Sequence, residues 1–139
     1  FGLNLGFAFQ IIDDVMDMVA DSGLWGKPLG NDLSQGNFTL PLILAINGKQ
    51  YGKQIRNLLQ QRANIAALTT EIINLVVMSG AIGEAIEHAT AFLERSTEHL
   101  LGIPASDSLE ALKNTCSSFI ETHRTVLERY YPLTRRQAR

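Results

Sequence analysis

The chain carries the sequence FQIIDDVMD at residues 9–17, in which three aspartates interrupt an otherwise apolar stretch. From Leu3 to Val19 the apolar residues recur with the spacing of a helix rather than of a strand. On a helix, Asp13 and Asp17 lie one turn apart on one face, and Asp14 lies about 100° around the axis. Like charges so placed repel, and the macrodipole disfavours anions near a helix C-terminus. A bound cation is the simplest compensation, so this run is where function should be sought.

The rest of the sequence predicts an all-helical fold. We expect a first helix over residues 1–20 and then an irregular, glycine-rich segment over 21–37. Thr39 is expected to cap a short helix that runs to about residue 46. Further helices are expected at about 50–61, 66–79, 83–101 and 107–131. Asp107 and Glu110 give the last of them a start that resembles a capping box.

Composition and charge exclude several classes of protein. With 139 residues, 45% of them hydrophobic and 19% charged, the chain has the composition of one globular domain. A net charge of −2 does not suggest a nucleic-acid binder, and no apolar run is long enough to span a membrane. The one cysteine, Cys116, has no partner for an internal disulfide, and we expect a cytoplasmic protein. Because the chain starts with Phe1 and already reads as mid-helix there, we expect that an upstream part is missing.

The sequence GKPLGNDL at residues 26–33 follows the acidic run. Taken alone, a DDxxD string is more often a solvated acidic patch than a metal site, and a Gly-Lys-Pro turn is an ordinary surface loop. Together they favour a different interpretation. Carboxylates on a rigid helix suit Mg²⁺, and Lys27 supplies a mobile positive charge for a diphosphate.

These stretches, with GNFTLP at residues 36–41, closely resemble the second aspartate-rich region of trans-polyprenyl diphosphate synthases. The resemblance is closest to the medium- and long-chain bacterial enzymes. A looser resemblance continues to about residue 124. It implies an all-α helical bundle of the isoprenoid synthase type, with residues 1–124 a C-terminal portion of one synthase domain and 125–139 a basic tail.

The resemblance also implies an activity. The family joins an allylic diphosphate to isopentenyl diphosphate in isoprenoid biosynthesis, with Mg²⁺ held between two aspartate-rich motifs. Its members are usually homodimers. For this chain the resemblance implies a homodimer or an assembly with the missing N-terminal half.

Roles carry over to single positions of this chain. The resemblance makes Asp13 the direct Mg²⁺ ligand, with Asp14 and Asp17 supporting the metal shell through waters or hydrogen bonds. It places Lys27 on the allylic diphosphate, so that Asp13 and Lys27 carry the catalysis.

The substrate contacts are implied in the same way. Phe9 and Gln10 would line the site near isopentenyl diphosphate, although from the residues alone Phe9 reads as core and Gln10 as a polar residue on a helix face. Asp32 matches a loop position that orders Lys27. Many members carry lysine at the position of Asn37, so one diphosphate contact is lost or replaced.

The first aspartate-rich motif of the family is absent from this sequence. We therefore expect this chain alone to give essentially no turnover. One alternative is a non-catalytic helical subunit or fragment that binds a partner chain through its uncovered N-terminal side. A terpene cyclase of the same fold is a weaker alternative, because Asn31-Asp32-Leu33-Ser34 breaks the spacing of that family's second metal motif.

Overall fold

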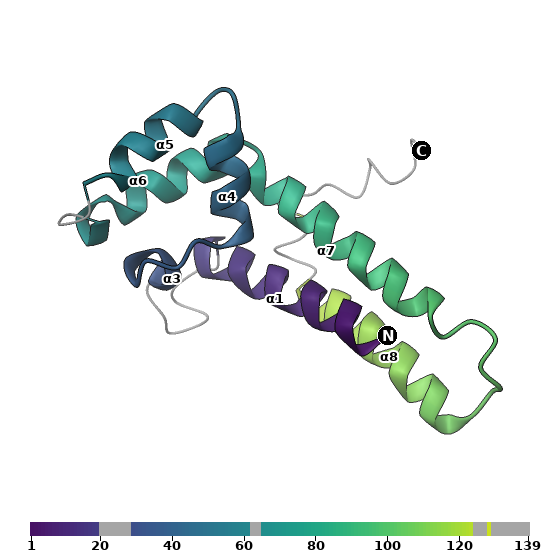
Figure 1. Ribbon diagram of the computed structural model, residues 1–139. Coiled ribbons are helices and arrows are strands. Elements are labelled where there is room, and N and C mark those ends of the chain that lie inside the picture. Colours follow the sequence, from purple (N-terminus) through teal and green to yellow (C-terminus); the bar gives the residue numbers. More distant parts are fainter. Residues whose placement is uncertain (20–28, 62–64, 124–127, 129–139) are drawn as a thin grey trace.

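The computed structural model describes residues 1–19, 29–61, 65–123 and 128, with the side chain of Ile120 excepted. Within these residues the chain forms seven helices and no strand (Figure 1). The helices are α1 (Gly2–Val19), α3 (Asn31–Ser34), α4 (Leu40–Asn47), α5 (Gly52–Leu59), α6 (Ile65–Met78), α7 (Ala81–Glu98) and α8 (Asp107–Thr122). The predicted all-α class is confirmed.

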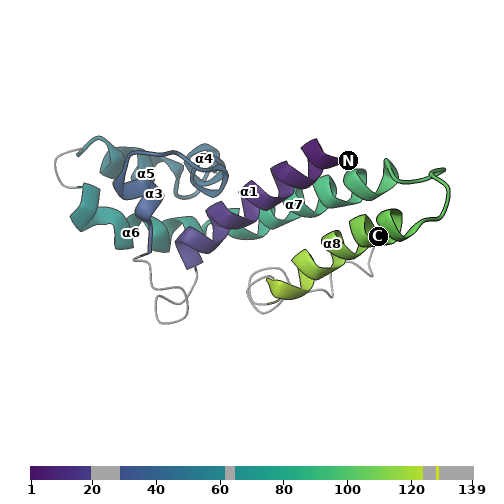
Figure 2. The ribbon, with the colours of Figure 1, turned by 90° about the horizontal axis from the view of Figure 1, so that it is seen from below.

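The main contact of the fold joins α1 and α7, which lie side by side along most of their lengths (Figures 1 and 2). Both helices place apolar residues at three- and four-residue intervals, so each has one apolar face to bury. From α1 the buried residues include Ala8, Ile12 and Val15. On α7, Ala85 and Ala89 are almost completely buried. This seam fixes the orientation of α1 and therefore of its acidic run.

The other helices divide between the two ends of this pair. Helices α4, α5 and α6 gather beside the start of α7, and α8 runs beside its far half (Figures 1 and 2). The C-terminal end of α1 consequently faces α3 and α4. Helices α4 and α5 approach closely, since a Cβ on Gly52 would collide with the carbonyl oxygen of Ile46.

Most predicted helices are found within a few residues of their expected bounds. One element was missed, because the expected irregular segment over 21–37 contains the short helix α3. Residues 20–28, in the same segment, lie outside the described residues. Helix α8 is described to Thr122, and most of its expected extension to residue 131 likewise lies outside them.

Two predicted caps need correction. Thr39 does occupy the N-cap position of α4, but its side chain makes no capping hydrogen bond. The cap of α8 is Ser106 rather than Asp107, and the Ser106 hydroxyl accepts the backbone N–H of Leu109 at 3.2 Å. The N-cap was therefore predicted one residue too late, and the start of α8 is no capping box, because Leu109 stands at the position where a capping box has Glu or Gln.

None of the helices in the described residues is, by itself, long and apolar enough to cross a membrane. Helices α6 and α7 reach that length and composition only as a pair, and they are bent by 68° at their junction.

Candidate active site

The three aspartates of α1 differ in exposure because the helical period turns each to a different side. Asp14 faces the interior and is 8% exposed, Asp17 is half-buried, and Asp13 is exposed. The predicted arrangement of Asp13 and Asp17 on one face of a helix is thus present. The three side chains nevertheless have different surroundings.

Asp14 connects α1 to the beginning of α4. Its Oδ1 accepts a hydrogen bond from Nε2 of Gln10 at 2.9 Å, one turn earlier on the same helix. The carboxylate also lies close to the backbone N–H of Leu40, the first residue of α4, and this N–H favours its ionised form. A carboxylate of α1 therefore lies at the N-terminus of α4, where the buried hydroxyl of Thr39 has no hydrogen-bond partner among the described residues.

Asp17 connects α1 to α3. Its Oδ1 accepts the backbone N–H of Asn31 and its Oδ2 that of Asp32, both at 3.2 Å. Its own carbonyl oxygen accepts the N–H of Gly30 at 2.8 Å. A carboxylate from α1 thus lies at the N-terminus of α3. The N-terminus is the end of a helix that favours negative charge.

Gly30 packs the connection between α1 and α3 closely against α6. Its φ of +70° is a left-handed conformation that glycine adopts without strain. A Cβ at this position would collide with Cγ2 of Thr69 and would lie 2.7 Å from Cδ1 of Ile73. The segment that follows the acidic run is therefore held between α1 and α6.

The surroundings make the buried carboxylates reluctant to ionise. Burial raises the pKa of Asp14, and the hydrogen bond from Gln10 and the nearby N–H of Leu40 only partly oppose it. Burial likewise raises the pKa of Asp17, although the hydrogen bonds from the N–H groups of Asp32 and Asn31 lower it in part. The negative charges of Asp32 and Asp13 add to both increases. A cation beside these groups would stabilise their ionised forms.

The donor set suits a hard divalent cation such as Mg²⁺, because it offers oxygen ligands alone. Asp13 is the member of the motif that accepts no hydrogen bond from the described residues. No three histidine, cysteine, aspartate or glutamate side chains of the described residues are arranged to hold an ion by themselves. The described part of the chain can therefore supply one side of a metal site.

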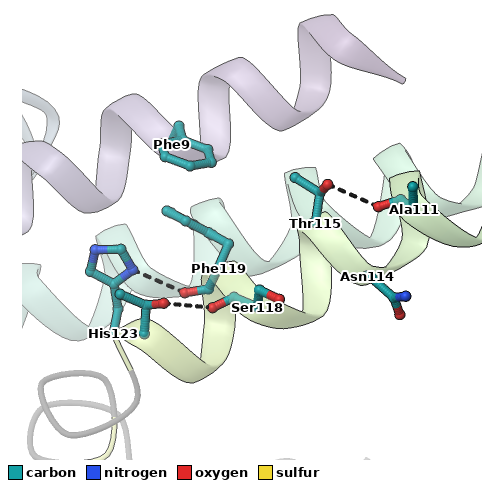
Figure 3. Close-up of a pocket in the computed structure, with 8 residues that line it drawn as sticks. Phe9, Ala111, Asn114, Thr115, Ser118, Phe119 and His123 are labelled. Atoms are coloured by element: carbon teal, nitrogen blue, oxygen red, sulfur yellow. Dashed lines mark hydrogen bonds between the residues drawn. The ribbon is translucent and has the colours of Figure 1, made fainter.

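Phe9 lies on another side of α1, against α8. Its ring is 48% exposed and stacks on the ring of Phe119, with the centroids 4.0 Å apart (Figure 3). The ring of Phe119 also contacts that of His123, whose Nδ1 lies 2.9 Å from the carbonyl oxygen of Phe119. The expectation that Phe9 is core is therefore only half right, because one part of the ring packs and the other is open.

A cavity of about 610 Å³ opens beside this aromatic stack. The residues that line it come from α1 and from α8 or its C-terminal end: Phe9, Ala111, Asn114, Thr115, Ser118, Phe119, Thr122 and His123 (Figure 3). The sequence analysis did not single out the residues from α8. The sequence pattern that could have indicated them is weak, because it consists only of an aromatic residue, Phe119, and a histidine, His123, one helical turn apart.

The structure therefore brings together only part of the predicted site. Asp13, Asp14 and Asp17 share the end of α1, and Gln10 joins them through its hydrogen bond to Asp14. The predicted diphosphate contact, Lys27, lies outside the described residues.

Residues 1–76 match the family model for polyprenyl synthetase, which is more than half of the chain. The chain is thus a member of the polyprenyl synthetase family. The resemblance inferred from the sequence is confirmed.

Its similarity to individual relatives indicates which synthases of the family it resembles. The chain is 40% identical over 118 residues to the all-trans-nonaprenyl-diphosphate synthase (geranyl-diphosphate specific) of Rhodobacter capsulatus, with 82% of this chain and 35% of the relative covered. It is 33% identical over 114 residues to solanesyl diphosphate synthase 1, chloroplastic, of Arabidopsis thaliana, covering 82% of this chain and 27% of the relative. It is 33% identical over 122 residues to heptaprenyl diphosphate synthase component 2 of Geobacillus stearothermophilus, covering 82% and 35%.

These relatives carry names of medium- and long-chain synthases, as the sequence analysis expected. The chain spans between 27% and 35% of their length. No solved structure matches the chain.

Proposed function

We propose that this chain supplies the C-terminal part of the active site of a Mg²⁺-dependent polyprenyl diphosphate synthase of the medium- or long-chain type. The observation that carries the proposal is the state of the three aspartates. The Asp17 carboxylate accepts two backbone N–H groups at the start of α3, and the Asp14 carboxylate lies at the start of α4. Asp13 is exposed beside them. The membership of the family and the names of the relatives support the same reaction class.

In the proposed site Asp13 holds Mg²⁺, and the ionised Asp14 and Asp17 contribute negative charge nearby. The ion, when bound, neutralises the charge of a departing diphosphate. Lys27 provides a point charge for the allylic diphosphate. Phe9 gives the hydrocarbon part of isopentenyl diphosphate an apolar wall whose other side is fixed by Phe119.

Because the chain spans between 27% and 35% of the length of these relatives, a complete site requires other residues. We propose that these come from an N-terminal portion that bears the first aspartate-rich motif, and that the complete protein forms a homodimer. The chain alone should then have essentially no activity. A cytoplasmic location remains a prediction, and fractionation of cells that express the complete protein would test it.

A chimera tests the proposed function. The segment of the Rhodobacter capsulatus synthase that matches this chain would be replaced by this chain, and Mg²⁺-dependent incorporation of radiolabelled isopentenyl diphosphate would be measured. We expect long-chain product from the chimera and none from the 139-residue chain alone. Asp13→Asn in the chimera should reduce kcat by about 100-fold or more, because one ligand of the charge-neutralising ion is lost.

Lys113→Asn in the same chimera is the control, because it shows how much a substitution outside the proposed site changes the rate. Lys113 is an exposed residue of α8, and its replacement should leave the rate within about two-fold, as for a surface substitution away from the site. A properly folded chimera without activity, or one in which Asp13→Asn keeps full activity, would contradict the proposed function.

The second candidate is a non-catalytic helical subunit that binds a partner chain. It is favoured by the exposed apolar side chains on α1, where Leu3 is 73% and Phe7 47% exposed. The name of one relative, heptaprenyl diphosphate synthase component 2, indicates an enzyme with more than one component, which is compatible with binding to a partner chain but does not indicate a loss of activity. This candidate predicts that Leu3→Glu abolishes association with the partner, whereas Asp13→Asn leaves both association and function intact.

A further inference from the structure

We propose that Asp17 is a positioning residue that ties α3 to the end of α1, and not a ligand of the metal ion. This role rests on the proposed function, because it assigns different tasks to the three aspartates of the proposed metal site. Asp13 is then the exposed carboxylate available to the ion. Asp17 instead sets where the segment after the acidic run lies.

The geometry of Asp17 is the first support. Its two carboxylate oxygens are each engaged by a backbone N–H, that of Asn31 on Oδ1 and that of Asp32 on Oδ2. The N–H of Gly30 bonds to the carbonyl oxygen of the same residue at 2.8 Å. Three consecutive amides of the segment therefore depend on one residue of α1. A carboxylate oxygen that accepts an N–H has one direction fewer in which to bind an ion.

The second support is that these bonds lie between two fixed surfaces. On one side is α1, held along α7. On the other is α6, where Thr69 and Ile73 leave no room for a side chain at position 30. A shift of α3 toward α6 is thus blocked by contact, and the hydrogen bonds to Asp17 oppose a shift away from α1.

The third support is what α3 carries. The backbone N–H of Asn37 donates to the carbonyl oxygen of Asp32 at 2.8 Å, and Nδ2 of Asn37 lies 3.5 Å from Oδ1 of Asp32. The position of Asn37 therefore follows from that of Asp32, which Asp17 holds. At the far end of the segment the Asp14 carboxylate lies close to the N–H of Leu40. Residues 30–40 are consequently bonded to α1 at their start and lie beside it again at their end.

Amide hydrogen exchange on the 139-residue chain tests the tie directly. Asp17→Ala removes both acceptors, and we expect the amides of Asn31 and Asp32 to exchange about ten-fold faster or more, as for a lost hydrogen bond to a charged group. Asp17→Asn keeps one acceptor oxygen and should give a smaller increase. Asp13→Ala is the matched control, since Asp13 accepts no hydrogen bond from the described residues, and the two amides should exchange as in the unaltered chain. The helical circular dichroism signal shows whether each variant is folded, and if Asp17→Ala is not, Asp17→Asn decides.

Steady-state kinetics separates positioning from metal binding. In the complete synthase that carries this chain, Asp17→Asn should raise the KM for the allylic diphosphate several-fold and leave the Mg²⁺ concentration for half-maximal rate unchanged. Asp13→Asn should raise that Mg²⁺ concentration and lower kcat. A loss of stability alone would not divide the two variants in this way.

Two results would overturn the role of Asp17. One is unchanged exchange of the Asn31 and Asp32 amides in the folded Asp17 variants. The other is an increase in the Mg²⁺ requirement for Asp17→Asn as large as that for Asp13→Asn, which would make Asp17 a ligand. If the synthase were inactive even without substitutions, the proposed function would fail, and the exchange rates would still decide whether Asp17 holds α3.

Discussion

Gly30 lies so close to Thr69 that a side chain at position 30 would collide with the Thr69 methyl group. The two residues are far apart in the sequence, and they join the loop after the acidic run to α6. Because Gly30 also has a φ of +70°, both the backbone and the packing at this position require glycine.

Gly30→Ala should therefore destabilise the chain by about 2–4 kcal/mol, as the sum of a left-handed backbone and an overpacked contact. The measurement is the free energy of unfolding from a denaturant titration. Gly36→Ala is the matched control, because Gly36 has a similar φ of +84° but nothing within 4 Å of the added Cβ. It should cost only the backbone part, about 1 kcal/mol. Equal losses for the two variants would show that the contact with Thr69 is not tight.

The N-caps of α4 and α8 should respond differently to the loss of a hydroxyl. Thr39 is 9% exposed and its Oγ1 has no hydrogen-bond partner in the part of the chain that the structure describes, so Thr39→Val removes a buried, unsatisfied group at nearly constant shape. We expect the free energy of unfolding to stay the same or rise by up to about 1 kcal/mol. Ser106→Ala removes a hydroxyl that accepts the Leu109 N–H and should cost about 1 kcal/mol. A clear loss of stability in Thr39→Val would mean that its hydroxyl has a partner after all.

Asp14→Asn should change how stability depends on pH. Since the pKa of Asp14 is raised in the folded state above its ordinary value of 3.8, folding favours the neutral form. The stability that Asp14 contributes is complete below that ordinary value and is lost as the pH rises through the raised pKa. Asparagine stays neutral and keeps an oxygen for the Leu40 N–H, and the Gln10 amide can turn to accept from it.

The variant should therefore be more stable than the unaltered chain at pH 7, and this advantage should shrink as the pH falls. Denaturant titrations at a series of pH values between about 3 and 7 measure the difference. An advantage that stays constant, or grows toward low pH, would contradict the raised pKa of Asp14.

The stacked rings of Phe9 and Phe119 should be energetically coupled. A double-mutant cycle with Phe9→Leu and Phe119→Leu should give a coupling free energy of about 0.5–1.5 kcal/mol, as for other stacked aromatic pairs. Phe119→Leu alone should cost more than Phe9→Leu, because Phe119 is 5% and Phe9 48% exposed. Losses that add to within about 0.3 kcal/mol would indicate independent rings.

Much of the fold follows from local sequence patterns. The repeated apolar residues of α1 and α7 predict two amphipathic helices, and these helices form the main seam of the molecule. The same periodicity correctly puts Asp13 and Asp17 on one face and Asp14 around the axis. Such predictions succeed because neighbours along a helix are set by its period alone.

The features that were missed depend on contacts between distant parts of the chain. Helix α3 has four residues and no strong local signal, and its N-terminal amides are satisfied by Asp17, 14 and 15 residues earlier. The stack of Phe9 on Phe119 joins the two ends of the described chain. Spacing along the sequence cannot show which helices meet, so neither feature was predictable from a local pattern.

The position of residues 30–40 beside α1 has a consequence for substitutions at position 37. Asp17 holds the start of this segment through Asn31 and Asp32, and Asp14 lies at its other end, so the side chain at position 37 can be exchanged with little displacement of its neighbours. Asn37 is exposed, so a larger or charged side chain there would not have to be buried. A substitution at this position can therefore change the charge offered to a ligand while the surrounding helices keep their arrangement.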